Sequence, residues 1–409
     1  MRILHTSDWH LGVSSGPTSR VPEQERFLEW LHGQLKSQEV DALLIAGDVF
    51  DTMHPSAEAQ TLFYRFLARV AETGVRDVVV IGGNHDSAAR LEAPRALLET
   101  VRVHVIGGLP LAEARAERMV IPLRGRGSEE VQAVCLAVPY VHEYRLGIRT
   151  SDLDQKQNRA QFRERFGALY SELADAAEQR FPGCPLVATG HMTLGTGSTS
   201  EDYPREIHQV GTLEGLPVDL LDPRIVYTAL GHIHRSYPVA GSSARYCGSP
   251  IPYSLTEMST ARQVLLVDLD ALPDVQKLEV PLQRELICLD GSPHDLVDEL
   301  RSLTWTTPLP PLVHIRVRSA LADPGLPRRL YEAVASHASD QRPVLVEVQH
   351  RTTASELLGE SRAALKSLDE MEPEEVFGLL CDANGDLVDS ERTQLETAYR
   401  IAASTQGAA

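Results

Sequence analysis

Five short motifs in this sequence are rich in aspartate and histidine, and each directly follows an apolar run. The motifs are Asp8-Trp9-His10, Gly47-Asp48-Val49-Phe50-Asp51, Gly83-Asn84-His85-Asp86, Gly190-His191 and Gly231-His232-Ile233-His234. Residues just past the strand ends of an α/β sheet lie together along one edge, where ligands bind. We therefore expect the five motifs to converge on one site, although they are far apart in the sequence.

Seven side chains of these motifs are oxygen or nitrogen donors, and none is a thiolate. They are Asp8, His10, Asp48, Asn84, His191, His232 and His234. Such donors suit Mn²⁺, Fe²⁺ or Zn²⁺ and argue against a structural zinc site. Seven donors are too many for one ion that must also hold water. They fit two ions that share a carboxylate, and a pair of metals about 3.5–4 Å apart is the arrangement that clamps in-line phosphoryl displacement.

Each motif taken singly is as well explained by local structure as by metal binding. Gly-Asp is frequent where a strand meets a turn, and Asn84-His85-Asp86 can form an Asx turn. The occurrence of all five motifs at strand ends favours a joint metal site. The other ten histidines, such as His5 and His54, are interpreted as surface or satisfied polar residues.

The elements that position these motifs follow the pattern of a layered α/β fold over roughly the first 270 residues. The strand-like runs are Ile3-Leu4, 42–46, 78–81, 101–106, 134–138, 186–189, 225–230 and 264–269. The helical stretches between them lie around 22–38, 56–73, 88–99 and 155–180. Leu62, Phe63, Phe66 and Leu67 form an apolar face on the second helical stretch, which either core burial or a dimer interface would explain.

The rest of the chain differs in style from the first part. Residues 282–350 predict a small α/β unit without a catalytic motif, in the order strand (284–289), helix (293–303), strand (312–317), helix (325–336), strand (344–349). The tail, 351–409, carries 12 acidic and 5 basic residues in helical stretches around 355–368, 373–381 and 388–402. It is either a solvated helical hairpin or a docking element. The apolar residues it would offer to a partner are Leu357, Leu358, Phe377, Leu379 and Leu380.

The composition excludes several classes of protein. With 409 residues and 43% hydrophobic content, the chain is too apolar for intrinsic disorder and long enough for two or three domains. No apolar run approaches the roughly 18 residues that a membrane span needs. Five scattered cysteines without CxxC spacing argue against a disulfide framework and a zinc ribbon. We expect a reduced, cytoplasmic, multi-domain protein that does not enter the membrane.

The charge balance bears on any polyanionic substrate. The 39 basic and 57 acidic residues give a net charge of −18, which repels nucleic acid at long range. A nucleic-acid enzyme with this balance needs bound cations, a local arginine patch or a basic partner. Arg20 and Arg90 lie beside the metal motifs and are candidates for phosphate contacts, with ordinary surface arginines as the alternative.

The series D-x-H, G-D-x-x-D, G-N-H-D, G-H and G-H-x-H resembles that of calcineurin-like metallophosphoesterases. The stretches 2–12, 46–52, 229–235 and 246–252 are similar to the SbcD family, the nuclease subunits of bacterial SbcCD complexes. This resemblance covers nearly the whole chain and is most specific over 1–100 and 186–256. It implies a four-layer α-β-β-α metallophosphoesterase sandwich over 1–280, a small α/β capping domain over 281–350 and a helical C-terminal segment over 351–409.

The resemblance also implies roles for single residues. One metal ion would be held by Asp8, His10, Asp48 and His234, and the other by Asp48, Asn84, His191 and His232. His85 would protonate the leaving oxygen or stabilise the transition state, which suits an imidazole whose ordinary pKa lies near working pH. Asp51 would orient His85, with a helix N-cap before the 56–73 helix as the alternative.

The implied function is a two-metal DNA nuclease with Mn²⁺ as the expected ion and Fe²⁺ as the alternative. Its activities would be 3′–5′ exonuclease action on double-stranded DNA and endonuclease action on single strands and hairpins, in DNA repair, recombination and replication. The tail would dock on the coiled-coil base of the SbcC ATPase, and helices 56–73 and 88–99 would form a homodimer within a heterotetramer at the nucleoid. The alternatives are a small-molecule phosphodiesterase on the same scaffold and a scaffold subunit with a nearly silent site.

Overall fold

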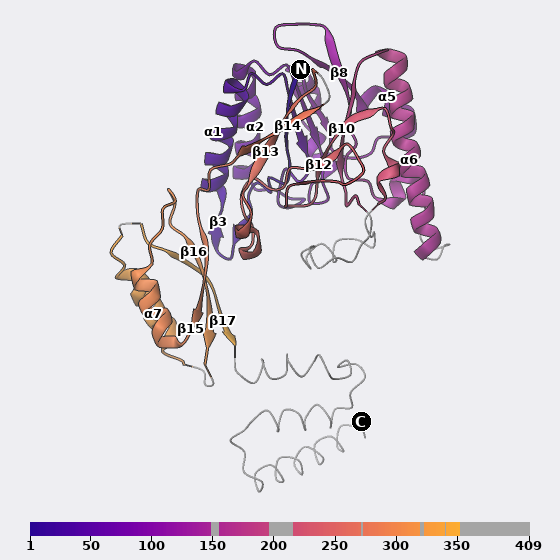
Figure 1. Cartoon of the computed structure of the whole chain (residues 1–409). Coiled ribbons are helices and arrows are strands. Elements are labelled where there is room, and N and C mark those ends of the chain that lie inside the picture. The colour runs from indigo at the N-terminus through magenta and orange to yellow at the C-terminus, as the bar shows by residue number, and fades with distance from the viewer. Residues whose placement is uncertain (149–154, 196–215, 271–272, 320–322, 340, 352–409) are drawn as a thin grey trace, which may run out of the picture. The chain divides into compact units, whose positions relative to one another are not determined.

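The computed structural model describes residues 1–148, 155–195, 216–270, 273–319, 323–339 and 341–351. The chain divides into two compact units (Figure 1). Of the described residues, the first unit contains Met1–Leu286 with Thr307–Leu309, and the second contains Ile287–Thr306 and those that follow Leu309. The tail predictions for 352–409 lie outside the described residues, and the three-domain division stays a prediction.

The first unit contains two six-stranded sheets. The first sheet has the order β14-β13-β1-β4-β5-β6, and the second has the order β11-β12-β10-β9-β8-β7. The first sheet's strands are β1 (Arg2–Thr6), β4 (Ala42–Ala46), β5 (Asp77–Ile81), β6 (Val103–Ile106), β13 (Gln263–Asp268) and β14 (Asp274–Glu279). The second sheet's strands are β7 (Val120–Arg124), β8 (Val131–Leu136), β9 (Leu186–His191), β10 (Ile225–Gly231), β11 (Tyr237–Pro238) and β12 (Ala244–Tyr246). A separate short hairpin pairs β2 (Ser14–Ser15) with β3 (Thr18–Ser19).

Helices cover the outer faces of the two sheets, with α1 and α2 on one side of the strands and α5 and α6 on the other (Figure 1). The helices of this unit are α1 (Val21–Ser37), α2 (Ala57–Val70), α3 (Ala88–Glu92), α4 (Arg95–Glu99), α5 (Ala112–Met119) and α6 (Gln155–Arg180). Its 3₁₀ turns are η1 (Ala71–Thr73), η2 (Glu143–Leu146), η5 (Val218–Leu220) and η6 (Leu255–Ser259). The first unit is therefore the α-β-β-α sandwich that the resemblance implied.

Strand β4 shows why the inner strands are apolar throughout. Leu43 and Ile45 pack in the core under α1 and α2, whereas Ala42, Leu44 and Ala46 pack in the core between the sheets. A strand with both faces buried has no polar alternation, so it takes the form of a short continuous apolar run. The same rule explains the all-buried strands β5 and β9.

Several elements of the first unit differ from the prediction. The stretch 88–99 is not one helix but two short ones, α3 and α4, because Pro94 at the junction has no N–H to continue the helical hydrogen bonds. Helix α5 was not predicted, since Met119 is its only large apolar residue, and strands β7, β11, β12 and β14 were not predicted either.

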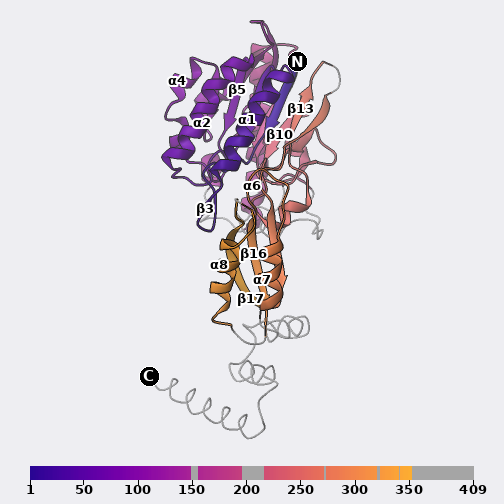
Figure 2. The ribbon, with the colours of Figure 1, turned by 90° about the vertical axis from the view of Figure 1, so that its left-hand side faces the viewer.

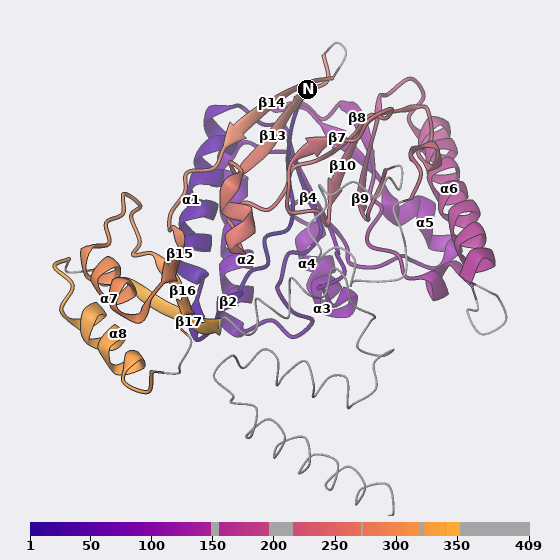
Figure 3. The same cartoon turned by 60° about the horizontal axis from the view of Figure 1, so that its bottom comes forward.

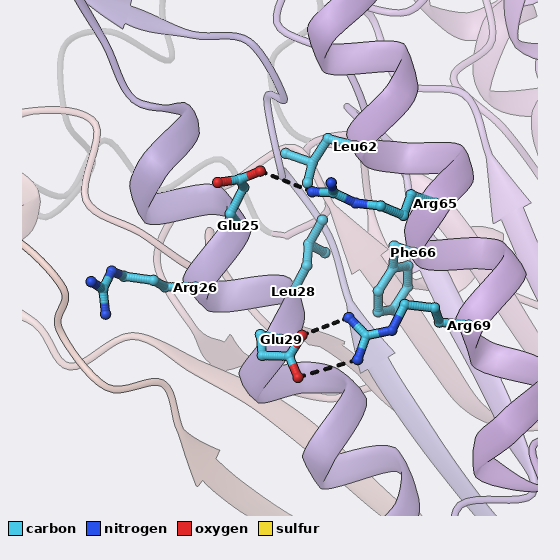
Figure 4. A pocket seen from close by; sticks show the side chains of 8 residues that line it. All are labelled: Glu25, Arg26, Leu28, Glu29, Leu62, Arg65, Phe66 and Arg69. Atoms are coloured by element: carbon cyan, nitrogen blue, oxygen red, sulfur yellow. Dashed lines mark hydrogen bonds and ion pairs between the residues drawn. The ribbon is translucent and has the colours of Figure 1, made fainter.

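The outer surface of α1 and α2 carries a groove spanned by ion pairs (Figure 4). Arg65 of α2 donates to Glu25 of α1 at 2.8 Å, and Arg69 donates to Glu29 at 2.5 Å. Below these pairs, Leu62 and Phe66 are buried against the first sheet. Core burial therefore accounts for the apolar face of α2, and the homodimer stays a prediction.

The second unit is a three-stranded sheet with two helices that pack together (Figures 2 and 3). Its elements are β15 (Leu286–Gly291), α7 (Pro293–Ser302), β16 (Leu312–Arg318), α8 (Leu326–Ala335) and β17 (Val344–Arg351). Ser292 caps α7 by accepting from the N–H of Asp295. Leu296 and Leu330 of the helices pack with Ile315 of the sheet in a separate core. The order of elements is the predicted one.

Among the helices of the described ranges, none combines the length and apolar composition required to cross a bilayer.

Candidate metal centre

Both sheets end their central strands at the same place. In the first sheet β1, β4 and β5 are parallel neighbours, and Thr6 pairs with Ile45 while Ala46 pairs with Ile81. The strands therefore end nearly level. In the second sheet the last residues of β9 and β10 pair with each other. Each predicted donor lies at or just after one of these five strand ends, so the topology brings all seven together.

One half of the cluster is centred on the side-chain oxygen of Asn84. This oxygen lies 3.1 Å from Nε2 of His191 and 3.0 Å from Nδ1 of His232. The Oδ2 atom of Asp48 lies 3.2 Å from the same His191 nitrogen. Asp48 and Asn84 at the ends of first-sheet strands thus face His191 and His232 at the ends of second-sheet strands.

The other half is centred on His10. Its Nε2 lies 3.2 Å from Nε2 of His234 and 3.6 Å from Oδ2 of Asp48. A ligand atom of Asp8 lies within 4.8 Å of those of His10 and His234. Asp48 therefore stands between the two halves, in the position required of a shared carboxylate.

The backbone at the cluster adopts conformations that side chains normally avoid. Asp8, His10, Asp48 and His232 have φ values of 54°, 42°, 48° and 91°, and they are four of the six non-glycine residues with positive φ in the described ranges. Such strain persists only where surrounding contacts hold it, and it concentrates at functional sites. Here main-chain hydrogen bonds hold it, from Asp8 N to Gly47 O and from His10 N to Asp48 O, both 3.0 Å.

Gly231 permits the close approach of the two sheets behind the cluster. A Cβ atom at this position would lie 1.9 Å from the carbonyl oxygen of Ala46. The end of β10 therefore packs against the end of β4 only because residue 231 has no side chain. The same Ala46 carbonyl lies 2.9 Å from Nδ1 of His191. His191 donates from Nδ1 to this carbonyl, which leaves the Nε2 lone pair directed at the cluster.

The electrostatics of the cluster couple Asp48 to His191. Burial opposes the charge of the His191 ring, but the adjacent carboxylate of Asp48 outweighs it and raises the pKa of His191 to about 9. Burial likewise opposes ionisation of Asp48, yet His191 and His10 hold its pKa well below the usual range. Burial and the nearby His191 lower the pKa of His232 to about 4. A cation bound here would replace a proton and supply the positive charge that stabilises the Asp48 carboxylate.

The positions of the His10 and His234 side chains indicate that a divalent cation fits between them. Nδ1 of His10 lies 3.5 Å from Oδ1 of Asp51, and Nδ1 of His234 lies 3.2 Å from Oε1 of Glu257. If both Nδ1 atoms carry their protons toward these carboxylates, the two Nε2 lone pairs face each other across 3.2 Å. Two such lone pairs repel unless a cation or a proton lies between them.

His85 and Asp51 meet, but not through the carboxylate. Nδ1 of His85 lies 2.8 Å from the main-chain carbonyl oxygen of Asp51, and the N–H of His85 donates to Oδ1 of Asp48 at 2.9 Å. The Asp51 carboxylate lies 3.5 Å from Nδ1 of His10 and within 4.8 Å of a ring nitrogen of His85. The alternative role of Asp51 as a helix N-cap is wrong, because Ser56 caps α2.

The two arginines considered for phosphate contacts, Arg20 and Arg90, differ in their exposure to solvent. Arg20 is 1% exposed and pairs with Glu23, and its Nη2 donates to the carbonyl of Pro252 at 3.0 Å. It is therefore neither a phosphate contact nor a surface arginine but part of a buried ion-pair network with Glu23. Arg90 is exposed on α3, and its role stays a prediction.

Three residues at the cluster had no role assigned from the sequence: Asp86, which belongs to the third motif, and Tyr253 and Glu257, which belong to none. Asp86 accepts hydrogen bonds from the N–H groups of Gly83, Val49 and Phe50 and so ties the second motif to the third. Tyr253 and Glu257 contact the first motif and His234, respectively. The only signal for the latter pair was the stretch 246–252, which resembled the family but had no assigned chemistry.

Comparison with known proteins places the whole cluster within one family. The calcineurin-like phosphoesterase family matches residues 1–236, a range that contains all five motifs. The chain is 32% identical over 398 residues to the D subunit of nuclease SbcCD from Escherichia coli K12, covering 90% of this chain and 94% of that protein. It is 35% identical over 327 residues to its counterpart in Rhodobacter capsulatus, covering 79% and 77%. With the counterpart in Bacillus subtilis it shares 36% identity over 273 residues, 66% of each chain. The chain belongs to the calcineurin-like phosphoesterases and, among them, to the D subunits of SbcCD nucleases.

Proposed function

We propose that this chain is the catalytic subunit of an SbcCD-type DNA nuclease that hydrolyses phosphodiester bonds with two divalent metal ions. The observation that carries the proposal is the position of Asp48 between two groups of donors. One group is Asp8, His10 and His234, and the other is Asn84, His191 and His232. Mn²⁺ is the proposed ion and Fe²⁺ the alternative, since both accept this donor set.

When bound, the two ions would lower the pKa of the attacking water and neutralise charge on the phosphoryl oxygens. The residues of this chain then have three tasks. The carboxylate of Asp48 holds the two halves in register, and the oxygen of Asn84 joins His191 to His232 within one half. The Ala46 carbonyl fixes the tautomer of His191. His85 is the proposed proton donor to the leaving oxygen.

The position of His85 supports that last role. Its main-chain N–H is held by Asp48 and its Nδ1 contacts the carbonyl of Asp51. If Nδ1 donates to this carbonyl, Nε2 is left to exchange a proton with substrate. Its ring packs edge-to-face against His10 with a centroid distance of 4.8 Å, so it borders the donor cluster. Asp51 would act on His85 through its carbonyl rather than its carboxylate.

DNA as substrate and SbcC as partner follow from the relatives, which are named as D subunits of nuclease SbcCD. We extend the proposal to 3′–5′ exonuclease action on duplex ends and to cutting of single strands and hairpins, in the cytoplasm at the nucleoid. The net charge of −18 favours a basic partner that brings DNA to the site. Residues 281–350 would cap the site and 351–409 would dock on SbcC.

The test is degradation of end-labelled linear duplex DNA with added Mn²⁺, by the chain alone and with its SbcC partner. Asp48→Ala is the inactivating variant, and Asp274→Asn on the exposed start of β14 is the matched control. Metal-dependent shortening that is lost only in Asp48→Ala supports the proposal. Asp48-dependent hydrolysis of bis(p-nitrophenyl) phosphate without DNA cleavage under either condition would favour a small-molecule phosphodiesterase. No hydrolysis of any diester would favour a scaffold subunit.

A further inference from the structure

The segment 249–262, which follows the last histidine motif, folds back against the donor cluster. Tyr253 donates from its hydroxyl to the carbonyl of Trp9 at 2.5 Å and of Asp8 at 3.1 Å. Its ring packs against those of His10 and His234, with centroid distances of 5.2 and 5.4 Å. The segment therefore restrains the first and last motifs at once.

Glu257, in the 3₁₀ turn η6, is the carboxylate of this segment that reaches the cluster. Its Oε1 lies 3.2 Å from Nδ1 of His234. Its Oε2 accepts from the N–H of Tyr253 at 3.1 Å and from the hydroxyl of Ser249 at 3.3 Å. With a side chain only 14% exposed, Glu257 is held in one orientation by several donors.

Arg262 completes this arrangement by contacting both Glu257 and His234. Its Nη1 lies 3.4 Å from Oε2 of Glu257 and donates to the carbonyl of His234 at 2.7 Å. A buried carboxylate that is paired in this way accepts hydrogen bonds and does not donate them. The proton between Glu257 and His234 therefore belongs to Nδ1 of the histidine.

We propose that Glu257 is a positioning residue for the metal ion held by Asp8, His10, Asp48 and His234. It fixes the tautomer and the ring orientation of His234, so that the Nε2 lone pair faces His10 and the donor cluster. Glu257 lies after His234, the last residue of the five motifs. It also lies outside residues 1–236, the range that matches the family. The inference rests on the proposed function, because it requires His234 to be a metal ligand.

The experiment is a Mn²⁺ titration of the full chain, in which electron paramagnetic resonance measures free Mn²⁺. The proteins compared are the wild type, Glu257→Gln, Glu257→Ala and the control Glu279→Gln, which changes an exposed glutamate on β14. Loss of such an outer carboxylate weakens metal affinity about 10- to 100-fold. We expect Glu257→Ala to weaken one of two sites by about 100-fold and Glu257→Gln, which keeps an acceptor oxygen, by about 10-fold. The other site and Glu279→Gln should match the wild type.

The outcomes separate the inference from the proposed function. A wild type that binds fewer than two Mn²⁺ ions overturns the two-metal proposal itself. A wild type with two sites, together with Glu257 variants that keep both affinities, overturns only the role of Glu257. Equal weakening of both sites in Glu257→Gln, with a lower melting temperature in EDTA, would mean that the residue merely supports the fold. Should Glu257→Ala fail to fold, Glu257→Gln decides the question alone.

Discussion

His5 should make the stability of the metal-free protein depend on pH. It lies on β1 behind the donor cluster, with Nδ1 2.9 Å from the hydroxyl of Tyr227 and Nε2 3.2 Å from the carbonyl of Leu230. The ring can donate to the carbonyl and accept from the hydroxyl only while it is neutral. Complete burial lowers its pKa from 6.5 to about 3, against a smaller opposing effect of the Leu230 carbonyl.

The sign and size of the effect follow from that lowered pKa. The unfolded chain takes up a proton on His5 below about pH 6.5, whereas the folded chain does not until about pH 3, so stability falls as the pH falls through this window. Between about pH 7 and about pH 5.5, the single group removes about 1.2 kcal/mol of the free energy of unfolding. The loss is about 4 kcal/mol at pH 3 and approaches about 5 kcal/mol only well below that pH.

The assay is urea unfolding in EDTA at these two pH values, for the wild type, His5→Gln and His54→Gln. A glutamine at position 5 can still donate to Leu230 and accept from Tyr227 but does not titrate. His54 is exposed and serves as the control. We expect the pH-dependent loss to be smaller in His5→Gln by about 1.2 kcal/mol and unchanged in His54→Gln. Equal losses in all three proteins would refute the assignment of a neutral, buried His5.

Three further predictions concern the cluster and its supports. His85→Ala should still bind two Mn²⁺ ions but lose about 10²- to 10⁴-fold in turnover of DNA, as expected for a proton donor. Loss of both ions would instead make His85 a ligand. Gly231→Ala should lower the free energy of unfolding by about 1–3 kcal/mol, because its Cβ would overlap the Ala46 carbonyl. The control is Gly33→Ala, on the exposed face of α1, where a Cβ meets no atom within 4 Å; it should raise the free energy of unfolding by about 0.5–1 kcal/mol. Equal changes in melting temperature for Gly231→Ala and Gly33→Ala would contradict the argument. Arg20→Leu should cost about 1–3 kcal/mol in urea unfolding, because the buried Glu23 loses its contact with Arg20 but keeps Arg284 at 3.2 Å. A cost below about 1 kcal/mol would mean that the Arg20–Glu23 pair adds nothing to stability.

The layered α/β fold and the positions of the donors could be predicted because both depend on local pattern, whereas the α-β-β-α order of the layers was implied only by the family resemblance. Buried strands such as β4 and β5 are short apolar runs, and a polar motif after each run marks the end of the strand. The types of donor then limit the chemistry, since aspartate, asparagine and histidine without cysteine suit divalent metals. The break between α3 and α4 at Pro94 was also local and could have been predicted from the proline.

Other features could not be predicted because they depend on contacts between distant segments. Arg20 beside the first motif resembled a phosphate contact, but the carbonyl of Pro252 and the carboxylate of Glu23 bury it. Asp51 meets His85 through a main-chain atom, which no residue type could indicate. Glu257 reaches His234 because η6 lies against the last histidine motif, and the neighbouring stretch 246–252 carried only a family resemblance without assigned chemistry.

The sequence by itself determined which side chains can bind metal and at which strand ends they lie, because strand periodicity and donor chemistry are properties of short segments. Only the tertiary structure decided how those strand ends meet. The level ends of β1, β4 and β5, and the approach of β10 to β4 at Gly231, place Asp48 between the two groups of donors. The carboxylates and carbonyls that orient the histidines come from other segments of the chain. The direction of a histidine's metal-binding lone pair depends on the hydrogen bond of its other ring nitrogen, and packing supplies the partner for that bond.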